Sequence, residues 1–249
     1  MKTRTKVLIT VTTYPLPSDT YYELVCTAGF TEQGRWIRIY PIPLSYLKEN
    51  RFRKYHWIEI DLNKRDLVKD FRPESFNPVR NDLSDMVIGA KIDTADNWAA
   101  RKSICLKYVY RELGQLIGEA HDPMVRTSLA TFKPAKILDF IVKPTEREWK
   151  PEWVEQQRQL NLFTNPEEKE DRRTFIQKVP YKFKYRIADI TGRESTMMIE
   201  DWEIGQLYWN CLRDHGTEEA AVQKVKEKYW DYWWWVKLVV DFAGSTDHQ

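Results

Sequence analysis

Short stretches of alternating or β-branched hydrophobic residues dominate the first part of the chain and predict a series of strands. These stretches lie at residues 5–13, 20–29, 36–40, 55–62 and 85–92. Their length is typical of strands, and proline, glycine or asparagine stands near several of their ends. Residues 70–82 (DFRPESFNPVRND) carry two prolines and no regular period. We therefore expect an irregular loop there.

Helical periodicity appears after this first series of strands. Residues 94–120 predict a helix in two pieces, because leucine, valine and isoleucine recur there at three- and four-residue spacing. Residues 127–143 predict one or two strands. Further on, we expect helices at 151–162, 201–213 and 217–230, strands at 179–188 and 197–199, and a last strand in WWWVKLVVDFAG. Many short strands with few helices favour β-barrel pieces with inserted helices, in an α+β fold that is β-rich.

Two of the predicted strands combine aromatic and cationic side chains. In the first, Trp36, Arg38 and Tyr40 alternate with Ile37 and Ile39, and a strand sends alternate residues to opposite faces. The isoleucines should face a core and the other three should form an exposed surface. The following strand adds Trp57 to that surface, and Arg53 and Lys54 precede it.

The second such strand is VPYKFKYRIA at residues 179–188. Tyr181, Phe183 and Tyr185 share one face, while Lys182, Lys184 and Arg186 share the other. Only one of these faces can be functional, and the sequence does not decide which.

Aromatic rings interleaved with cations suit single-stranded or structured nucleic acid, or a nucleotide, because rings stack on bases and cations contact phosphates. The same residue types dominate protein–protein hot spots, so a host or defence protein is an alternative partner. The nucleic-acid-binding residues that we expect are Arg35, Trp36, Arg38, Tyr40, Arg53, Lys54, Trp57, Lys182, Lys184 and Arg186.

Charge supports this interpretation through its distribution. The net charge is only +2, but residues 34–57 hold six Lys or Arg against one Glu, and residues 172–186 hold six and no acid. The three cysteines form no CxxC pair, which fits a reducing, cytoplasmic setting. The short apolar run near the N-terminus reads as a strand, and we expect no membrane association.

Little in the sequence points to catalysis. Glycine-rich phosphate loops and GxSxG elbows are absent, and the four histidines lie in unrelated contexts. The best acidic cluster is Glu200, Asp201 and Glu203. Such carboxylates at a helix start cap free amides, but they could instead serve a metal-dependent nuclease or nucleotide hydrolase. We expect a non-enzymatic binding module with no catalytic residues, metal or cofactor.

Several tracts together resemble a known family. They are ELVCTAGFTEQGRWIRIYPIP, RFRKYHWIEIDL with FRPESF, KPAKILDFIV with EREW, VPYKFKYRI and MMIEDWEIGQLY. This series resembles a prokaryotic and phage family with a dual OB-fold-like architecture that is associated with mobile elements and antiviral conflict. The resemblance implies two small OB-like β-barrels, an N-terminal one at 1–145 with a helical insertion and a C-terminal one at 146–249. Members of the family that the chain resembles carry Cys and His in the turn before the DWE tract. The corresponding turn in this chain, ADITGREST, contains neither residue.

Overall fold

The computed structural model describes residues 2–17, 23–43, 52–66, 70–152, 154–155, 177–231 and 238–241. Within these ranges the fold is α+β and strand-rich, as expected. No helix there is long and apolar enough to cross a membrane. The strands are β1 (Lys2–Thr12), β2 (Leu16–Pro17), β3 (Glu23–Thr31), β4 (Trp36–Pro43), β5 (His56–Lys64), β6 (Ser75–Pro78), β7 (Val87–Lys91), β8 (Leu129–Phe132), β9 (Lys136–Pro144), β10 (Tyr181–Ala188), β11 (Glu194–Met198) and β12 (Leu238–Asp241). The helices are α2 (Ala95–Cys105), α3 (Leu113–His121), α5 (Trp202–His215) and α6 (Glu218–Lys226), with the π-helical turn η2 (Glu227–Asp231) following α6.

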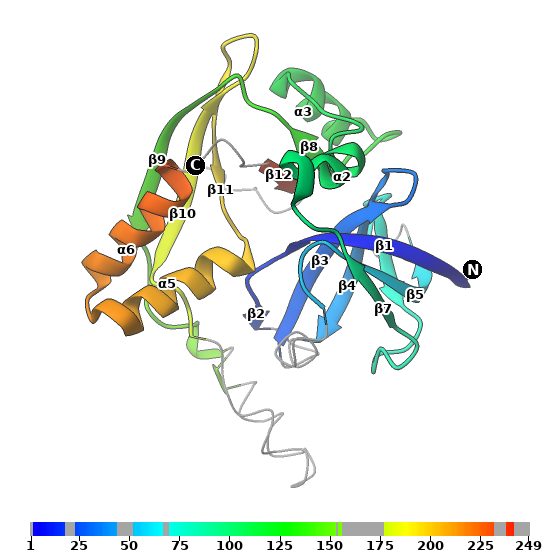
Figure 1. The fold of residues 1–249 in the computed structure, drawn as a ribbon, viewed down its shortest axis with the longest axis horizontal. Coiled ribbons are helices and arrows are strands. Elements are labelled where there is room, and N and C mark those ends of the chain that lie inside the picture. The colour runs from blue at the N-terminus through cyan, green and yellow to red at the C-terminus, as the bar shows by residue number, and fades with distance from the viewer. Residues whose placement is uncertain are drawn as a thin grey trace, which may run out of the picture.

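The N-terminal strands form a closed five-stranded barrel (Figure 1). Strand β1 pairs with β3 and with β5, and β3 pairs with β4. The ring closes through β6, which lies between β4 and β5 and runs parallel to β4. Strand β7 adds to β5 outside the ring. Counted in chain order, β1, β3, β4, β5 and β6 are the first to fifth strands of the barrel. Around the ring they follow the order 1-2-3-5-4, and the fourth strand pairs with the first.

The expectation of an irregular loop at 70–82 is wrong over Ser75–Pro78, because β6 lies there. This strand is four residues long and ends in proline, so it shows no hydrophobic period. It forms because β4 and β5 leave a gap in the ring that backbone hydrogen bonds of β6 fill. The strand that the pattern misses is thus the one that closes the barrel.

The barrel interior is aliphatic, as the alternation predicts. Ile37 and Ile39 of β4 and Ile58, Ile60 and Leu62 of β5 are at most 2% exposed. They pack with Val7, Ile9, Ile42, Phe52 and Leu83 in one cluster.

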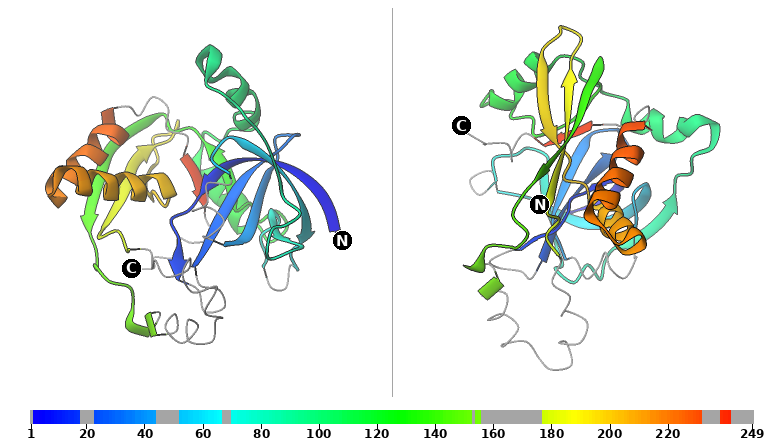
Figure 2. Two further views of the ribbon diagram at one scale, coloured as in Figure 1. Left: turned by 60° about the horizontal axis from the view of Figure 1, so that its bottom comes forward. Right: turned by 90° about the vertical axis from the view of Figure 1, so that its left-hand side faces the viewer.

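The second region contains an antiparallel sheet in the order β11-β10-β9 and a separate two-stranded ladder of β8 and β12. Helices α5 and α6 lie on one face of the sheet (Figure 2, right). The core between them is rich in aromatic residues and includes Phe140, Phe183, Tyr185, Tyr208 and Val225. In the described residues these strands do not close into a ring, so the second barrel that the resemblance implies is not seen.

The contacts favour a boundary between the two regions near residue 110. Strand β9 precedes residue 145 yet pairs along its length with β10, and the second core begins at Leu113. The boundary at 145 stays a prediction. Two other expectations lie mostly outside the described residues: the helix at 151–162 and the first half of the last strand, which includes Trp233–Trp235.

Candidate functional site

Tyr14, in the loop after β1, joins the barrel to α5. Its ring stacks on Trp202 with centroids 5.7 Å apart. The Trp209 indole N–H donates to the Tyr14 hydroxyl at 2.9 Å, and that hydroxyl donates to the Gln177 carbonyl at 2.7 Å. The Tyr14 ring occupies the space beside Gly205, so a Cβ added at position 205 would lie 2.2 Å from the nearest ring carbon. The loop is therefore anchored firmly in the second region.

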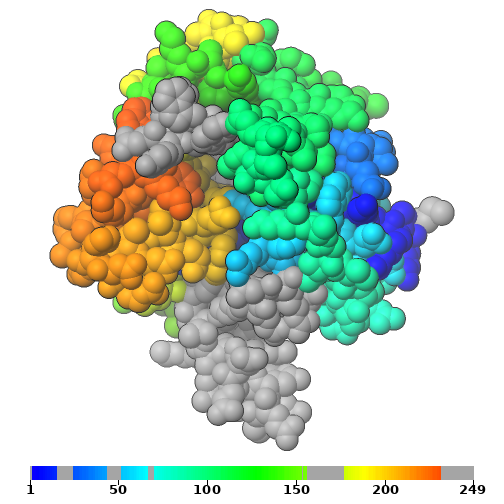
Figure 3. All heavy atoms as spheres, viewed as in Figure 1, coloured from blue at the N-terminus to red at the C-terminus, as the bar shows by residue number. Residues whose placement is uncertain are grey.

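A second contact between the regions is an ion pair between Lys54 and the start of α5. The Lys54 ammonium binds the Asp201 carboxylate and lies 3.2 Å from Glu203. Burial alone would lower the pKa of Lys54, but the charges of Asp201 and Glu203 outweigh it and raise that pKa. In Figure 3 the golden surface near the start of α5 meets the cyan surface of the barrel. Lys54 therefore acts as a structural cation here and does not form part of an open basic surface.

Asp201 also caps α5, because its side chain accepts from the backbone N–H of Glu203 at 2.7 Å. The interpretation of this acidic cluster as a helix cap is thus confirmed for Asp201. In the described part of the chain, no group of three or more His, Cys, Asp or Glu is arranged to hold a metal ion.

Arg38 forms the third contact, and its predicted exposure is wrong. Its side chain is only 1% exposed. One guanidinium nitrogen donates to the Ser128 hydroxyl at 3.3 Å, and that hydroxyl donates to Glu74 at 2.8 Å. The second region covers the outer face of β4 here, which the alternation along β4 could not show.

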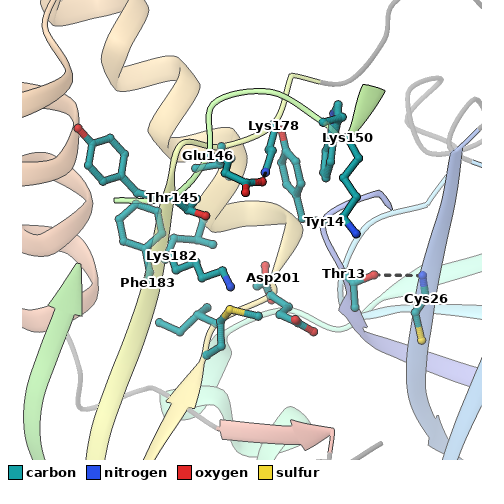
Figure 4. Close-up of a pocket in the computed structure, with 18 of the residues that line it drawn as sticks. Thr13, Tyr14, Cys26, Thr145, Glu146, Lys150, Lys178, Lys182, Phe183 and Asp201 are labelled. Carbon is teal, nitrogen blue, oxygen red and sulfur yellow. Dashed lines mark hydrogen bonds and ion pairs between the residues drawn. The ribbon is translucent and has the colours of Figure 1, made fainter. Parts of the chain in front are cut away.

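These contacts surround a pocket of about 740 Å³ between the two regions. The barrel side supplies Tyr14, Cys26, Arg38, Tyr40 and Arg72, and the other side supplies Trp149, Lys150, Lys178, Tyr181, Lys182 and Asp201, among others. Figure 4 shows Lys182 and Lys150 reaching in from two sides. A pocket of this size accommodates a ligand as large as a nucleotide.

Cations outnumber carboxylates in the wall of the pocket, with five Lys or Arg against three Glu or Asp. Some of these charges are already paired: Lys178 lies 3.2 Å from Glu146, and Arg72 binds Asp70 at 2.7 Å. Within the ranges that the structure describes, Lys182 makes no ion pair. The pocket therefore presents an uncompensated cation beside aromatic side chains.

The other expected residues of the first strand pair lie away from this pocket. Trp36 and Trp57 pack in a cluster with Leu8, Phe30 and Cys105, the last of which belongs to α2. Trp36 lies against Phe30 with centroids 4.0 Å apart. Arg35 and Arg53 are exposed. Of the seven residues expected from this part of the chain, only Arg38 and Tyr40 line the pocket.

Strand β10 shows the predicted alternation. Phe183 and Tyr185 are buried against the helices, and the Tyr185 hydroxyl donates to the Tyr229 carbonyl at 2.6 Å. Burial raises the pKa of Tyr185. Lys182, Lys184 and Arg186 lie on the opposite, outer face. The cationic side chains of β10 are therefore on its outer face, while Lys182 from that face and Tyr181 from the opposite face both line the pocket.

The sequence reasoning missed four notable residues of the pocket: Tyr14, Arg72, Trp149 and Lys150. Each lies outside a regular strand, where no period marks it. Two signals were available: their position near prolines, in TYPLP, FRPE and EREWKP, and the place of Arg72 and Trp149 in the tracts FRPESF and EREW.

Comparison with family models divides the chain in two. Residues 112–239, just over half of the chain, match the model described as Domain of unknown function (DUF8757). The chain belongs to the DUF8757 family. Residues 3–107 match a second model, Domain of unknown function (DUF8758). No curated protein and no solved structure matches the chain. The pocket thus lies between the DUF8757 region and the region similar to DUF8758.

Proposed function

We propose that this protein is a non-enzymatic module that binds a nucleotide unit of nucleic acid in the pocket between its two regions. The observation that supports this most is the composition of the pocket wall. Tyr40 and Trp149 bring rings to the wall for stacking on a base, and each ring has a cation 5.6 Å from its centroid, Arg65 and Lys178 respectively. Lys182, which makes no ion pair among the described residues, brings an ammonium group for a phosphate.

The position of the pocket on the barrel supports the same proposal. A Greek-key barrel with this strand order, whose third and fifth strands are parallel, is OB-like in our interpretation. OB-folds bind oligonucleotides on strands 2 and 3 and on the loops L12 and L45. Here strands 2 and 3 are β3 and β4, which contribute Cys26, Arg38 and Tyr40, while Tyr14 and Arg72 come from the two equivalent loops.

Two alternatives have less support. A hydrolase would use Glu200, Asp201 and Glu203, but Asp201 caps α5 and shares Lys54 with Glu203. A host or defence protein as partner stays a prediction. The association with mobile elements and antiviral conflict stays a prediction.

Binding of fluorescently labelled oligothymidylate at low salt tests the proposal. Tyr40→Ala and Trp149→Ala should each weaken binding about tenfold, because stacking contributes about 1–3 kcal/mol per base. Tyr108→Ala is the matched control, since that ring is 59% exposed and does not line the pocket. Absence of binding by the wild type, or equal losses in all three variants, would refute the proposal.

A further inference from the structure

The outer face of the β9–β10 pair carries three lysines next to the pocket. Lys182 of β10 stands directly opposite Lys143 of β9, and Lys184 follows two residues along the same face. None of the three forms an ion pair among the residues that the structure describes. Farther along β10, Arg186 lies 3.3 Å from Glu194 and opposite Asp139. The uncompensated charge is therefore concentrated at the pocket end of the strand.

A like-charged pair directly across two antiparallel strands destabilises a sheet. Lys182 and Lys143 form such a pair. Phosphates bound at both ammonium groups, one on each, would offset the repulsion, whereas water alone only screens it. This pairing favours a bound polyanion over a neutral ligand.

The lysine face continues from the wall of the pocket. Lys182 and Met198 both line the pocket, and Met198 is the cross-strand partner of Lys184. Lys184 therefore stands at the rim. Alternate residues of a strand lie about 6.8 Å apart, so the ammonium groups of Lys182 and Lys184 can contact successive phosphates of an extended chain.

We infer that the ligand is a single strand of about three nucleotides or more, with one base in the pocket and its backbone along Lys182, Lys143 and Lys184. This rests on the proposed function, because the pocket must hold the base. A free nucleotide would reach Lys182 but leave Lys143 and Lys184 without a partner, whereas a strand engages all three. The path ends where Glu194 and Asp139 introduce negative charge.

The experiment is a length series of thymidine nucleotides, from the monophosphate to the hexanucleotide, measured by calorimetry at several salt concentrations. Affinity should rise until about three or four nucleotides and then level off. Three phosphate contacts on a single strand predict a slope of log K against log salt of about −2, and one contact predicts about −0.7. Lys143→Gln/Lys184→Gln should reduce hexanucleotide affinity to nearly that of the monophosphate and leave monophosphate binding unchanged.

The control is Lys91→Gln/Lys226→Gln, which removes the same charge from exposed positions on β7 and α6. Two results would contradict the inferred course of the nucleic-acid strand along the lysines: a hexanucleotide that binds no more tightly than the monophosphate, or equal losses of affinity in both double variants. In either case the proposed nucleotide pocket stands. If neither nucleotide binds, the proposed function fails and this inference fails with it. A polyglutamate peptide of matched charge that binds as tightly as the hexanucleotide would overturn the inference in favour of an acidic protein segment.

Discussion

Strands β4 and β10 share an alternation of rings and cations, yet the fold treats them in opposite ways. In β4 the cation Arg38 is buried and the rings of Trp36 and Tyr40 are partly covered. In β10 the rings of Phe183 and Tyr185 are buried and the lysines stay outside.

The difference follows from what else each strand has available for the core. Strand β4 carries Ile37 and Ile39, which fill the barrel, so its other face is left for the second region to cover. Strand β10 has no aliphatic alternative before Ile187, so its rings become the hydrophobic layer. Ring–cation alternation therefore identifies a ligand surface only when the position of the core is known.

The largest effect should come from breaking the buried ring layer of β10. Phe183→Ala should lower the free energy of unfolding by about 3–5 kcal/mol, because Phe183 is 2% exposed and its removal leaves a cavity. Its neighbour Lys184→Ala should change stability by less than about 0.5 kcal/mol. Urea unfolding followed by tryptophan fluorescence measures both. Equal losses would show that β10 does not separate core from surface.

The second effect concerns the buried cation of β4. Arg38→Leu should cost about 2–3 kcal/mol, because it removes a charged donor and leaves the Ser128 hydroxyl and Glu74 without it at the junction. Arg35→Leu, three residues earlier and exposed, should be nearly neutral. Thermal unfolding of the two variants provides the comparison. An equal stability for Arg38→Leu and the wild type would contradict the assignment of Arg38 as a structural residue.

The smallest effect concerns the hydrogen bond of Tyr185 in the ring layer of β10, and this effect depends on pH. Tyr185→Phe removes one hydrogen bond and should cost about 1 kcal/mol near pH 7. The pKa of Tyr185 is raised in the folded state, so its stabilising contribution is complete below the ordinary value of 10 and declines as pH rises above it. The gap between wild type and variant should therefore narrow from pH 9 to pH 11 in urea titrations. A gap that stays constant would mean that Tyr185 does not titrate differently in the two states.

Local patterns predicted most of the strands and helices, because alternation and helical spacing are properties of neighbouring residues. The same patterns placed Ile58, Ile60 and Leu62 correctly in the barrel core. They failed for β6, whose formation depends on backbone pairing with distant strands, and for Arg38, whose burial depends on Ser128 ninety residues away. The pocket was only half predictable, since Tyr40 and Lys182 lie in strands but Tyr14 and Trp149 lie in connections.

Gly205 has a consequence for how such proteins can diverge. Glycine in a helix is less favourable than alanine by about 0.5–1 kcal/mol, and here the ring of Tyr14 fills the place of a side chain. In a chimaera that combines residues 3–107 from one relative with residues 112–239 from another, a side chain at position 205 would clash with a ring at position 14. The two regions should therefore be inherited together, and substitutions at positions 14 and 205 should be found in the same lineages.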